Sequence, residues 1–400
     1  MNVFKKLYLK VSSFFSVEKK ELDNLTNEKT YKNLEEVFED MSNFYDKNDL
    51  VYFENLNVYA AFKYNIVKDI LENSNDINVS DVHLKLNNVY FSLDEKVHKK
   101  NKSAAVNHLE FLSKKLQHSE NEFTIKTFNS LVKFFPKDKP FDLVDYLIAP
   151  IVFINILKEY GFLEYMNEFD PENKAFDIQN VIDKVKIFSA DTDKLYEVIA
   201  THFNNDGKIP CEMLNLVNEI KQNTKVDDKD IPLFFTSMIF AGVESTISFI
   251  TSFFFVLFKD YPTIFNNGNN QKELYNIANE VLRIYTPVPY IYRTVRKDTN
   301  YRDYHLKKGD TIALFLGAAN VDKNFFEEPK KIKFGRYHKH LSFGKGEYAC
   351  IGRFASFRIA LNLVEYLAPY MNSIHLIDTN PSFYILNGML KTKLIIGSFK

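Results

Sequence analysis

A glycine-rich stretch near the C-terminal end of the chain, residues 340–352 (HLSFGKGEYACIG), contains a single cysteine, Cys350. Its three glycines are Gly344, Gly346 and Gly352. Glycines let the backbone approach a bulky planar group closely. An apolar helical pattern follows Cys350, and a cysteine at a helix N-terminus has a lowered pKa and favours the thiolate, the form that binds a metal. The spacing Phe-x-x-Gly-x-x-x-Cys-x-Gly, which starts at Phe343, therefore predicts a metal-ligating cysteine rather than a structural one.

The apolar stretch over residues 231–258 contains one ionisable side chain, Glu244. Hydropathy alone would suit a transmembrane helix. A carboxylate at the midpoint would cost about 2.5–3.5 kcal/mol on insertion scales, and Ala241 and Gly242 interrupt the apolar run beside it. A helix that is apolar all round also occurs in the core of a large soluble protein, which is what we expect here, without stable membrane insertion. A glycine in mid-helix then indicates the close approach of a flat group, and a buried glutamate indicates a chemical task.

The composition is that of an ordinary globular chain. Of its 400 residues, 46% are hydrophobic and 26% are charged, which rules out a disordered or collagen-like protein. The formal net charge of −1 gives no overall field that would attract nucleic acid, so we expect no nucleic-acid partner. Two cysteines cannot form a disulfide framework and favour a reducing compartment, which predicts a cytoplasmic protein. With 12 glycines, 12 prolines and no evident linker, we expect one mainly helical domain over residues 1–400.

The spacing of apolar residues predicts where the other elements lie. We expect a strand at 57–62 that turns into a helix at 65–72, further helices at 98–116, 277–285 and 361–368, short strands within 292–312, and a hairpin at 383–396 around Asn387 and Gly388. Residues 1–17 allow an interfacial amphipathic helix but are too polar for a signal or an anchor.

The cysteine stretch resembles the haem-ligand loop of the cytochrome P-450 family, the haem-thiolate monooxygenases, in their soluble bacterial form. Glu280 and Arg283 match the Glu-x-x-Arg of the helix before that loop, and Arg336 lies where a second arginine completes its ion-pair core. Residues 241–246 (AGVEST) resemble the oxygen-binding groove of the family's long central helix. The resemblance runs from about residue 57 to the C-terminus and so covers nearly the whole chain.

The resemblance implies a mainly α fold with a small β region, a long central distal helix, and a cysteine-ligand loop before a proximal helix. It implies haem b (iron protoporphyrin IX), with Cys350 as the axial thiolate and metal ligand, and O2 as co-substrate. It also implies that Glu244 and Ser245 relay protons, with Thr246 as a fallback donor. Ser245 stands where the family usually has threonine, and the lost methyl group is expected to raise uncoupling.

The resemblance further implies which residues contact the haem. Arg293 matches the family's propionate arginine, whereas His98 and Lys102 match a His-x-x-x-Arg pattern with lysine in the arginine position. Lysine is a point charge and not a bidentate fork, so we expect a weaker or water-mediated contact. Tyr348 replaces the usual histidine or arginine two residues before the cysteine. The other positions expected to line the haem are Phe343, Gly344, Gly346, Gly352, Ala241 and Gly242.

The implied protein is a monomer that receives electrons from a ferredoxin or flavodoxin with its reductase. An acidic partner would dock on the lysines of the early helix and of the segment before the cysteine: Lys99, Lys100, Lys102, Lys114, Lys115, Lys330, Lys331, Lys333, Lys339 and Lys345. The implied substrate is a largely hydrophobic small molecule, free or attached to a carrier protein, from secondary or specialised metabolism, and Phe240 and Ile291 are expected to line its pocket.

Two other functions remain open from the sequence. A peroxide-driven haem-thiolate enzyme would not need Glu244 and Ser245. A catalytically silent haem-binding interaction protein would account for the weakened propionate positions at Lys102 and Tyr348.

Overall fold

The structure is a computed structural model, and it describes residue 38, residue 42 and residues 47–397 except 55–56, 73–75, 80–94, 117–118, 164–165, 167–168, 171–172, 174–175, 207–208, 210, 224–229, 266–270, 337–338 and 387–388. The described chain divides into two compact units. The first unit comprises Met1–Leu84, Ser252–Arg353 and Asn380–Thr392, and the second comprises Lys85–Thr251, Phe354–Thr379 and Lys393–Lys400.

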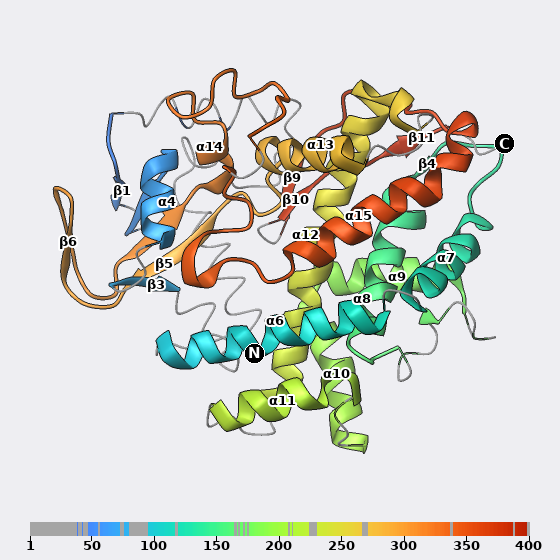
Figure 1. The fold of residues 1–400 in the computed structure, drawn as a ribbon, viewed down its shortest axis with the longest axis horizontal. Coiled ribbons are helices and arrows are strands. Elements are labelled where there is room, and N and C mark those ends of the chain that lie inside the picture. The colour runs from blue at the N-terminus through green and yellow to red at the C-terminus, as the bar shows by residue number, and fades with distance from the viewer. Residues whose placement is uncertain are drawn as a thin grey trace. The chain divides into compact units, whose positions relative to one another are not determined.

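The first unit contains a five-stranded sheet in the order β1-β2-β8-β5-β3 (Figure 1). Its strands are β1 (Val51–Phe53), β2 (Val58–Ala61), β8 (Thr311–Leu314), β5 (Ile291–Val295) and β3 (Ile77–Val79). The β2–β8 pair is parallel and the other pairs are antiparallel. Two separate hairpins accompany this sheet, namely β6 (Thr299–Tyr301) with β7 (Tyr304–Leu306), and β9 (Tyr384–Leu386) with β10 (Met389–Lys391).

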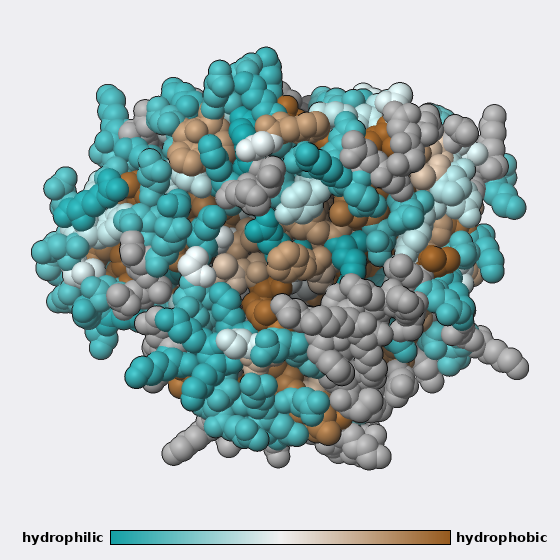
Figure 2. Space-filling model, viewed as in Figure 1, coloured by the Kyte–Doolittle hydropathy of each residue, from teal (hydrophilic) through white to brown (hydrophobic). Residues whose placement is uncertain are grey.

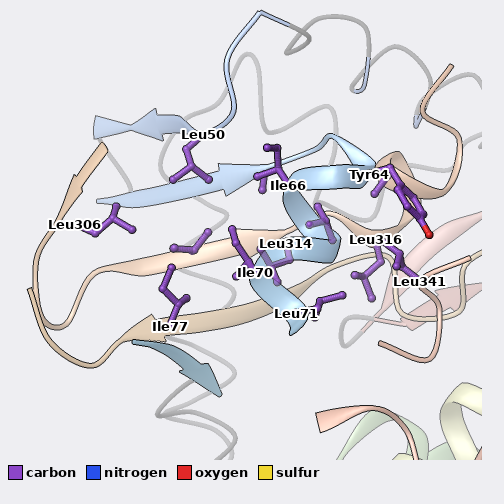
Figure 3. Packing of buried hydrophobic residues seen from close by; sticks show 14 of the residues in the cluster. Leu50, Tyr64, Ile66, Ile70, Leu71, Ile77, Leu306, Leu314, Leu316 and Leu341 are labelled. Atoms are coloured by element: carbon purple, nitrogen blue, oxygen red, sulfur yellow. The ribbon is translucent and has the colours of Figure 1, made fainter. Parts of the chain in front are cut away.

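Helix α4 (Tyr64–Glu72) covers the sheet and closes the core of the first unit (Figure 3). Its apolar residues recur at helical spacing, so Ile66, Ile70 and Leu71 share the buried face. They join Ile77 and Leu314 of the strands in one hydrophobic cluster, in which each residue named here is at most 4% exposed. Burying a side chain of this size contributes roughly 1.5–3 kcal/mol, so this cluster fixes α4 on the sheet.

The first unit also holds the elements on either side of the cysteine loop. They are α13 (Gln271–Ile284), α14 (Leu316–Asn320) and two 3-10 turns, η5 (Pro262–Phe265) and η6 (Gly346–Tyr348).

A buried ion network joins α13 to the segment before the loop. Glu280 accepts two hydrogen bonds of 3.0 Å from Arg283 and two, of 2.6 and 3.2 Å, from Arg336.

The same network satisfies the backbone around it. Arg283 also donates to the carbonyls of Asn320 (3.0 Å), Pro329 (2.5 Å) and Lys331 (3.1 Å), while the backbone N–H of Lys333 donates to Glu280 at 2.9 Å. Burial alone would raise the pKa of Glu280, but these donors and the charge of Arg283 hold that pKa below its ordinary value. The carboxylate is therefore ionised and fixed at neutral pH.

The second unit is helical (Figure 1). Its helices are α6 (Glu95–Leu116), α7 (Ser119–Val132), α8 (Ala149–Glu159), α9 (Ile178–Ala190), α10 (Thr192–Asp206), α11 (Cys211–Asn223) and α15 (Arg353–Leu367), whose first residue belongs to the first unit. A π-helical turn η2 (Val144–Ile148) precedes α8, a 3-10 turn η7 (Ala368–Ser373) follows α15, and β4 (Phe141–Asp142) pairs with β11 (Ile395–Ile396). Helix α8 packs on α7 and α9, and α11 packs on α6.

Helix α12 (Ile231–Asp260) is the long apolar helix predicted from the sequence. Its residues up to Thr251 belong to the second unit, and those from Ser252 belong to the first. By length and composition it is the one candidate for a membrane span among the described residues, yet 78% of its most apolar window is buried. Hydrophilic residues cover most of the described surface on the face drawn in Figure 2. We therefore assign α12 as a core helix.

The expected mainly α fold with a small β region is confirmed, with three corrections to the elements. Helix α13 begins at Gln271 and not at residue 277. The prediction missed its first turn because this turn is polar and carries no apolar period. Helix α15 begins at Arg353, where the helical pattern after Cys350 was expected, so the helix predicted at 361–368 extends toward the cysteine loop. The predicted hairpin ends at Lys391, because Ile395–Ile396 pairs with β4 instead. The predictions for residues 1–17 and for the turn at 387–388 lie outside the described residues.

We predict that Glu280→Gln destabilises the protein by about 3–5 kcal/mol, because it leaves the fully buried Arg283 without its counter-charge. Urea unfolding followed by circular dichroism measures this loss. The deficit should be largest above the ordinary glutamate pKa of 4.5 and should shrink as the pH falls through the lowered pKa of the folded state, since the wild-type carboxylate is then protonated too.

Glu328→Gln is the matched control. Glu328 pairs with Lys331 and Lys333 at the surface, where solvent screens the interaction, so its loss should leave the unfolding midpoint almost unchanged. Equal effects of the two substitutions would contradict the structural role assigned to Glu280.

Candidate active site

Cys350 lies at the end of a tightly hydrogen-bonded loop in the first unit, three residues before α15 begins. Its backbone N–H donates to the carbonyl of Phe343 at 2.8 Å, and the N–H of Gly344 donates to the carbonyl of Leu341 at 2.8 Å. The Cys350 side chain is exposed. An accessible thiol at the N-terminal end of a helix is the arrangement that favours a thiolate.

Two of the loop glycines adopt backbone conformations that other residues rarely adopt. Gly344 and Gly346 have φ angles of 66° and 69°. A Cβ on Gly346 would also lie 2.6 Å from the carbonyl oxygen of Leu71, at the end of α4, so the loop packs directly on that helix. By contrast, a Cβ on Gly352 would make only an ordinary contact with the Cys350 sulfur, at 3.8 Å. Gly352 is thus not required by the packing of the described protein.

A buried amide, Asn320, fastens the loop to α13 and α14, and the sequence analysis missed it. Its oxygen accepts from the N–H of Leu341 at 2.7 Å, and its nitrogen donates to the hydroxyls of Thr286 and Ser342, each at 2.9 Å. Ser342 in turn donates to the carbonyl of Leu282 at 2.6 Å. A single asparagine at the end of a short helix carries no sequence signal that it holds a loop, because its hydrogen-bond partners come from distant segments.

Arg293 of β5 is a buried cation that has no acidic partner among the described residues. It is 4% exposed, and its side chain donates one hydrogen bond, to the neighbouring carbonyl of Tyr292, at 3.0 Å. Burial lowers the pKa of its guanidinium to about 10, while nearby Tyr348 acts in the opposite direction. A buried guanidinium without a counter-charge is costly, so this position suits an anion such as a propionate.

Tyr348, a residue of the cysteine loop, lies near Arg293. Its phenol is hydrogen-bonded to the side chain of Asn78 on β3, and burial raises the phenol pKa above its ordinary value of 10.0, against the effect of Asn78. Tyr348 and Arg293 interact electrostatically. Asn78 was not singled out from the sequence.

The remaining predicted residues lie in the second unit. On α6, His98 is buried at 1% exposure and Lys102 is half-buried, and residues four apart share a helix face. On α12, Glu244 is 3% exposed, and its Oε1 accepts a hydrogen bond from the hydroxyl of Ser189 on α9. Ser245 donates instead to the carbonyl of Ala241 within its own helix, at 2.7 Å.

Helix α12 is accessible at one place in its otherwise buried middle. Ala241 is exposed and Gly242 and Ser245 are partly exposed, whereas the flanking Val243 and Thr246 are buried. A Cβ on Gly242 would lie 3.2 Å from Cδ1 of Ile156 on α8. The packing of α8 therefore favours the glycine, and the accessible strip beside it leaves space for a flat group.

The lysines before the cysteine are less free than the sequence suggested. Lys333 pairs with Glu328 at 2.5 Å and with Glu327 at 3.4 Å, and Lys331 pairs with Glu328 at 2.5 Å. Lys339 lies over the ring of Phe325. These acidic neighbours reduce the positive potential that an acidic partner would meet. The side chains of Lys114 and Lys115 lie outside the described residues.

Comparisons with known proteins agree with this arrangement. The family model described as Cytochrome P450 matches residues 272–392. Cytochrome P450(MEG) of Priestia megaterium is 27% identical over 216 residues, which are 52% of this chain and 50% of that protein. Cytochrome P450(BM-1) of Priestia megaterium is 34% identical over 115 residues, 28% of each chain. These sequence alignments span about half the length, or less, of the curated relatives.

Solved structures share the fold over much more of the chain. The cytochrome P450 enzyme CYP109B1 from Bacillus subtilis superimposes with a TM-score of 0.67 and 17% identity, covering 90% of this chain and 98% of that one. CYP109E1 from Bacillus megaterium, crystallised with testosterone, gives a TM-score of 0.66 and 20% identity, covering 92% and 99%. In its cysteine loop, in residues 272–392 and in its fold, the chain is similar to proteins of the cytochrome P450 family.

Proposed function

We propose that this protein is a haem-thiolate monooxygenase that oxidises a largely hydrophobic small organic molecule. The observation that carries the proposal is in the first unit: an accessible cysteine at a helix N-terminus, on a glycine-rich loop, accompanied by a buried arginine that has no carboxylate partner among the described residues. A planar, dianionic iron cofactor matches both features, since it needs a thiolate for its metal and a cation for its propionates.

The residues present fit haem b. Cys350 would ligate the iron, and Arg293 and Tyr348 would hold a propionate, with Asn78 fixing the phenol. The family resemblance assigns further haem contacts to His98 and Lys102 on α6 and to Ala241 and Gly242 on α12. Phe343, Gly344, Gly346 and Gly352 form the loop that presents the cysteine.

When bound, the haem supplies thiolate-ligated iron that activates O2 for insertion of one oxygen atom into the substrate. The chain's own contribution is proton supply. Glu244 is the buried acid on α12, and the hydroxyl of Ser245 or Thr246 passes its proton inward. Ser245 lacks the methyl group that would restrict its rotation, so its hydroxyl can return to the Ala241 carbonyl and leave the relay open.

The substrate and partner follow from chemistry and from the relatives. Phe240 and Ile291 are apolar, and the solved relative CYP109E1 was crystallised with testosterone and with corticosterone, so we propose an apolar substrate of similar size, free or carrier-tethered. Electrons would come from a separate ferredoxin or flavodoxin with its reductase. We propose a soluble protein, because its long apolar helix is a core helix. As the sequence analysis indicated, we also propose that it is a cytoplasmic monomer.

One observation favours a second candidate, a peroxide-driven haem-thiolate enzyme. The hydroxyl of Ser245 is bonded within its own helix, and Glu244 is bonded to Ser189, so the two groups of the expected relay are not bonded to each other. An enzyme that takes hydrogen peroxide directly needs no such relay.

We predict that the reduced, CO-saturated wild-type protein has the strongly red-shifted Soret band of thiolate-ligated haem, and that Cys350→Ser loses this band. Absorption spectra of the dithionite-reduced protein measure both. Cys211→Ser, which removes the other cysteine, is the control and should keep the band. Failure of the wild type to bind haem would overturn the proposed function.

For Arg293 we predict opposite effects on the apoprotein and the holoprotein. Arg293→Met removes an uncompensated buried charge, so it should stabilise the apoprotein against unfolding by about 1–3 kcal/mol, yet it should release haem faster to apomyoglobin. Arg302→Ala, an exposed arginine paired with Asp49, is the control and should change neither measurement. If Arg293→Met neither stabilises the apoprotein nor speeds haem release, Arg293 does not hold the propionate.

The relay is tested at Ser245. With a surrogate ferredoxin and reductase, Ser245→Ala should divert more of the NADPH-derived electrons to hydrogen peroxide, and Ser245→Thr should divert fewer, because the methyl group restricts the hydroxyl. The measurement is the ratio of peroxide formed to NADPH consumed. Unchanged ratios in Ser245→Ala and in Glu244→Ala would favour the peroxide-driven candidate instead.

A further inference from the structure

The acid of α12 is held by a helix that the sequence did not connect with it. Ser189 lies in the last turn of α9, and its hydroxyl donates a hydrogen bond to Oε1 of Glu244. The backbone of Ser189 has little freedom, because its helix neighbours Val185 and Phe188 are buried at 3% and 7% exposure. The donor therefore meets Glu244 from a fixed direction.

The surroundings of this contact are apolar. Ser189 and Glu244 border a small cavity that is otherwise lined by apolar side chains of α8, α9, α10 and α12, among them Phe153, Leu195 and Phe240. Among the described residues that line the cavity, Glu244 is the only ionisable one. A carboxyl group in an apolar cavity depends on hydrogen bonds to keep one orientation, since an unsatisfied polar group there is costly.

Ser245 does not orient its neighbour. Successive side chains of a helix point about 100° apart, and the Ser245 hydroxyl is bonded to the Ala241 carbonyl. The hydrogen bond to Oε1 of Glu244 thus comes from α9 and not from Ser245.

A serine is suited to this task in a way that a lysine or arginine is not. A hydroxyl both donates and accepts hydrogen bonds, so it can donate to the carboxylate and accept from the protonated acid. A cationic partner can only donate and would hold the group ionised. Ser189 can therefore keep the same geometry while Glu244 loses and regains its proton.

We propose that Ser189 is a positioning residue that fixes the carboxyl group of Glu244 for proton transfer. The proposal rests on the proposed function, because it assigns to Glu244 the role of proton donor. Ser189 itself touches neither the cofactor nor the substrate in this scheme.

The first test uses the haem-loaded protein with a surrogate ferredoxin and reductase, and compares Ser189→Ala, Ser189→Thr and Glu244→Gln. We expect Ser189→Ala to slow NADPH oxidation about fivefold, the effect of one ordinary hydrogen bond, and to increase the solvent isotope effect in D2O. Ser189→Thr restores the hydroxyl and should restore both values. In the Glu244→Gln background, Ser189→Ala should have no further effect, because Ser189 acts through Glu244.

A second readout needs no turnover. The infrared difference between wild type and Glu244→Gln isolates the band of the Glu244 carboxyl group, and the frequency of this band should shift in Ser189→Ala, since the hydrogen bond to Oε1 is lost. Ser237→Ala is the control: it removes a hydroxyl of α12 that donates to the Leu233 carbonyl. It should leave the NADPH oxidation rate, the isotope effect and the band frequency unchanged.

The outcomes separate the two proposals. If the reduced CO spectrum of every variant shows thiolate-ligated haem but Ser189→Ala behaves like Ser237→Ala, the role of Ser189 is overturned and the proposed function stands. If Ser189→Ala lowers activity without rescue by Ser189→Thr and without a shift of the Glu244 band, its effect is structural and the positioning role is also overturned. Absence of thiolate-ligated haem in the wild type would overturn both proposals.

Discussion

The arrangement of the cysteine segment depends on one buried negative charge, the carboxylate of Glu280. Arg283 and Arg336 compensate it, and Arg283 carries the connection to the carbonyl of Asn320, whose side chain holds Leu341 and Ser342 at the start of the loop. Burying such charges costs desolvation energy, so the network adds little net stability compared with an apolar core. What it provides is a defined geometry, because the two arginines bind one carboxylate and particular backbone carbonyls. The loop is therefore fixed to α13 and α14 before any cofactor binds.

The first unit keeps a feature that works against its own stability. Arg293 lies on a central strand, is almost fully buried, and has no counter-charge among the described residues. Nothing in the packing of the sheet requires a guanidinium there. Local conflicts of this kind are expected where a protein binds a ligand of opposite charge, since the ligand completes the interaction. The exposed thiol of Cys350 is the second such feature in the same unit, and one planar anionic metal cofactor resolves both.

In the second unit the notable feature is the middle of α12. A helix that is apolar on all sides normally offers no chemistry, yet here a buried carboxyl group and a partly exposed hydroxyl lie on consecutive residues that face different directions. The two side chains are therefore held by different helices. Helix α9 sets the orientation of Glu244, whereas the Ser245 hydroxyl is free to rotate between its own helix backbone and whatever occupies the accessible strip.

The sequence by itself determined the fold class, the cysteine loop and most element positions, because apolar periodicity, glycine spacing and short motifs are local signals that do not depend on distant contacts. Even so, the start of α13 was missed, since its polar first turn carries no apolar period. Only the tertiary structure decided which residues lack or share partners. The isolation of Arg293, the network of Asn320, the pairing of Lys331 and Lys333 with Glu328, and the contact of Ser189 with Glu244 join residues far apart in the chain or depend on burial. Such relations follow from packing in three dimensions, and no local pattern of residues encodes them.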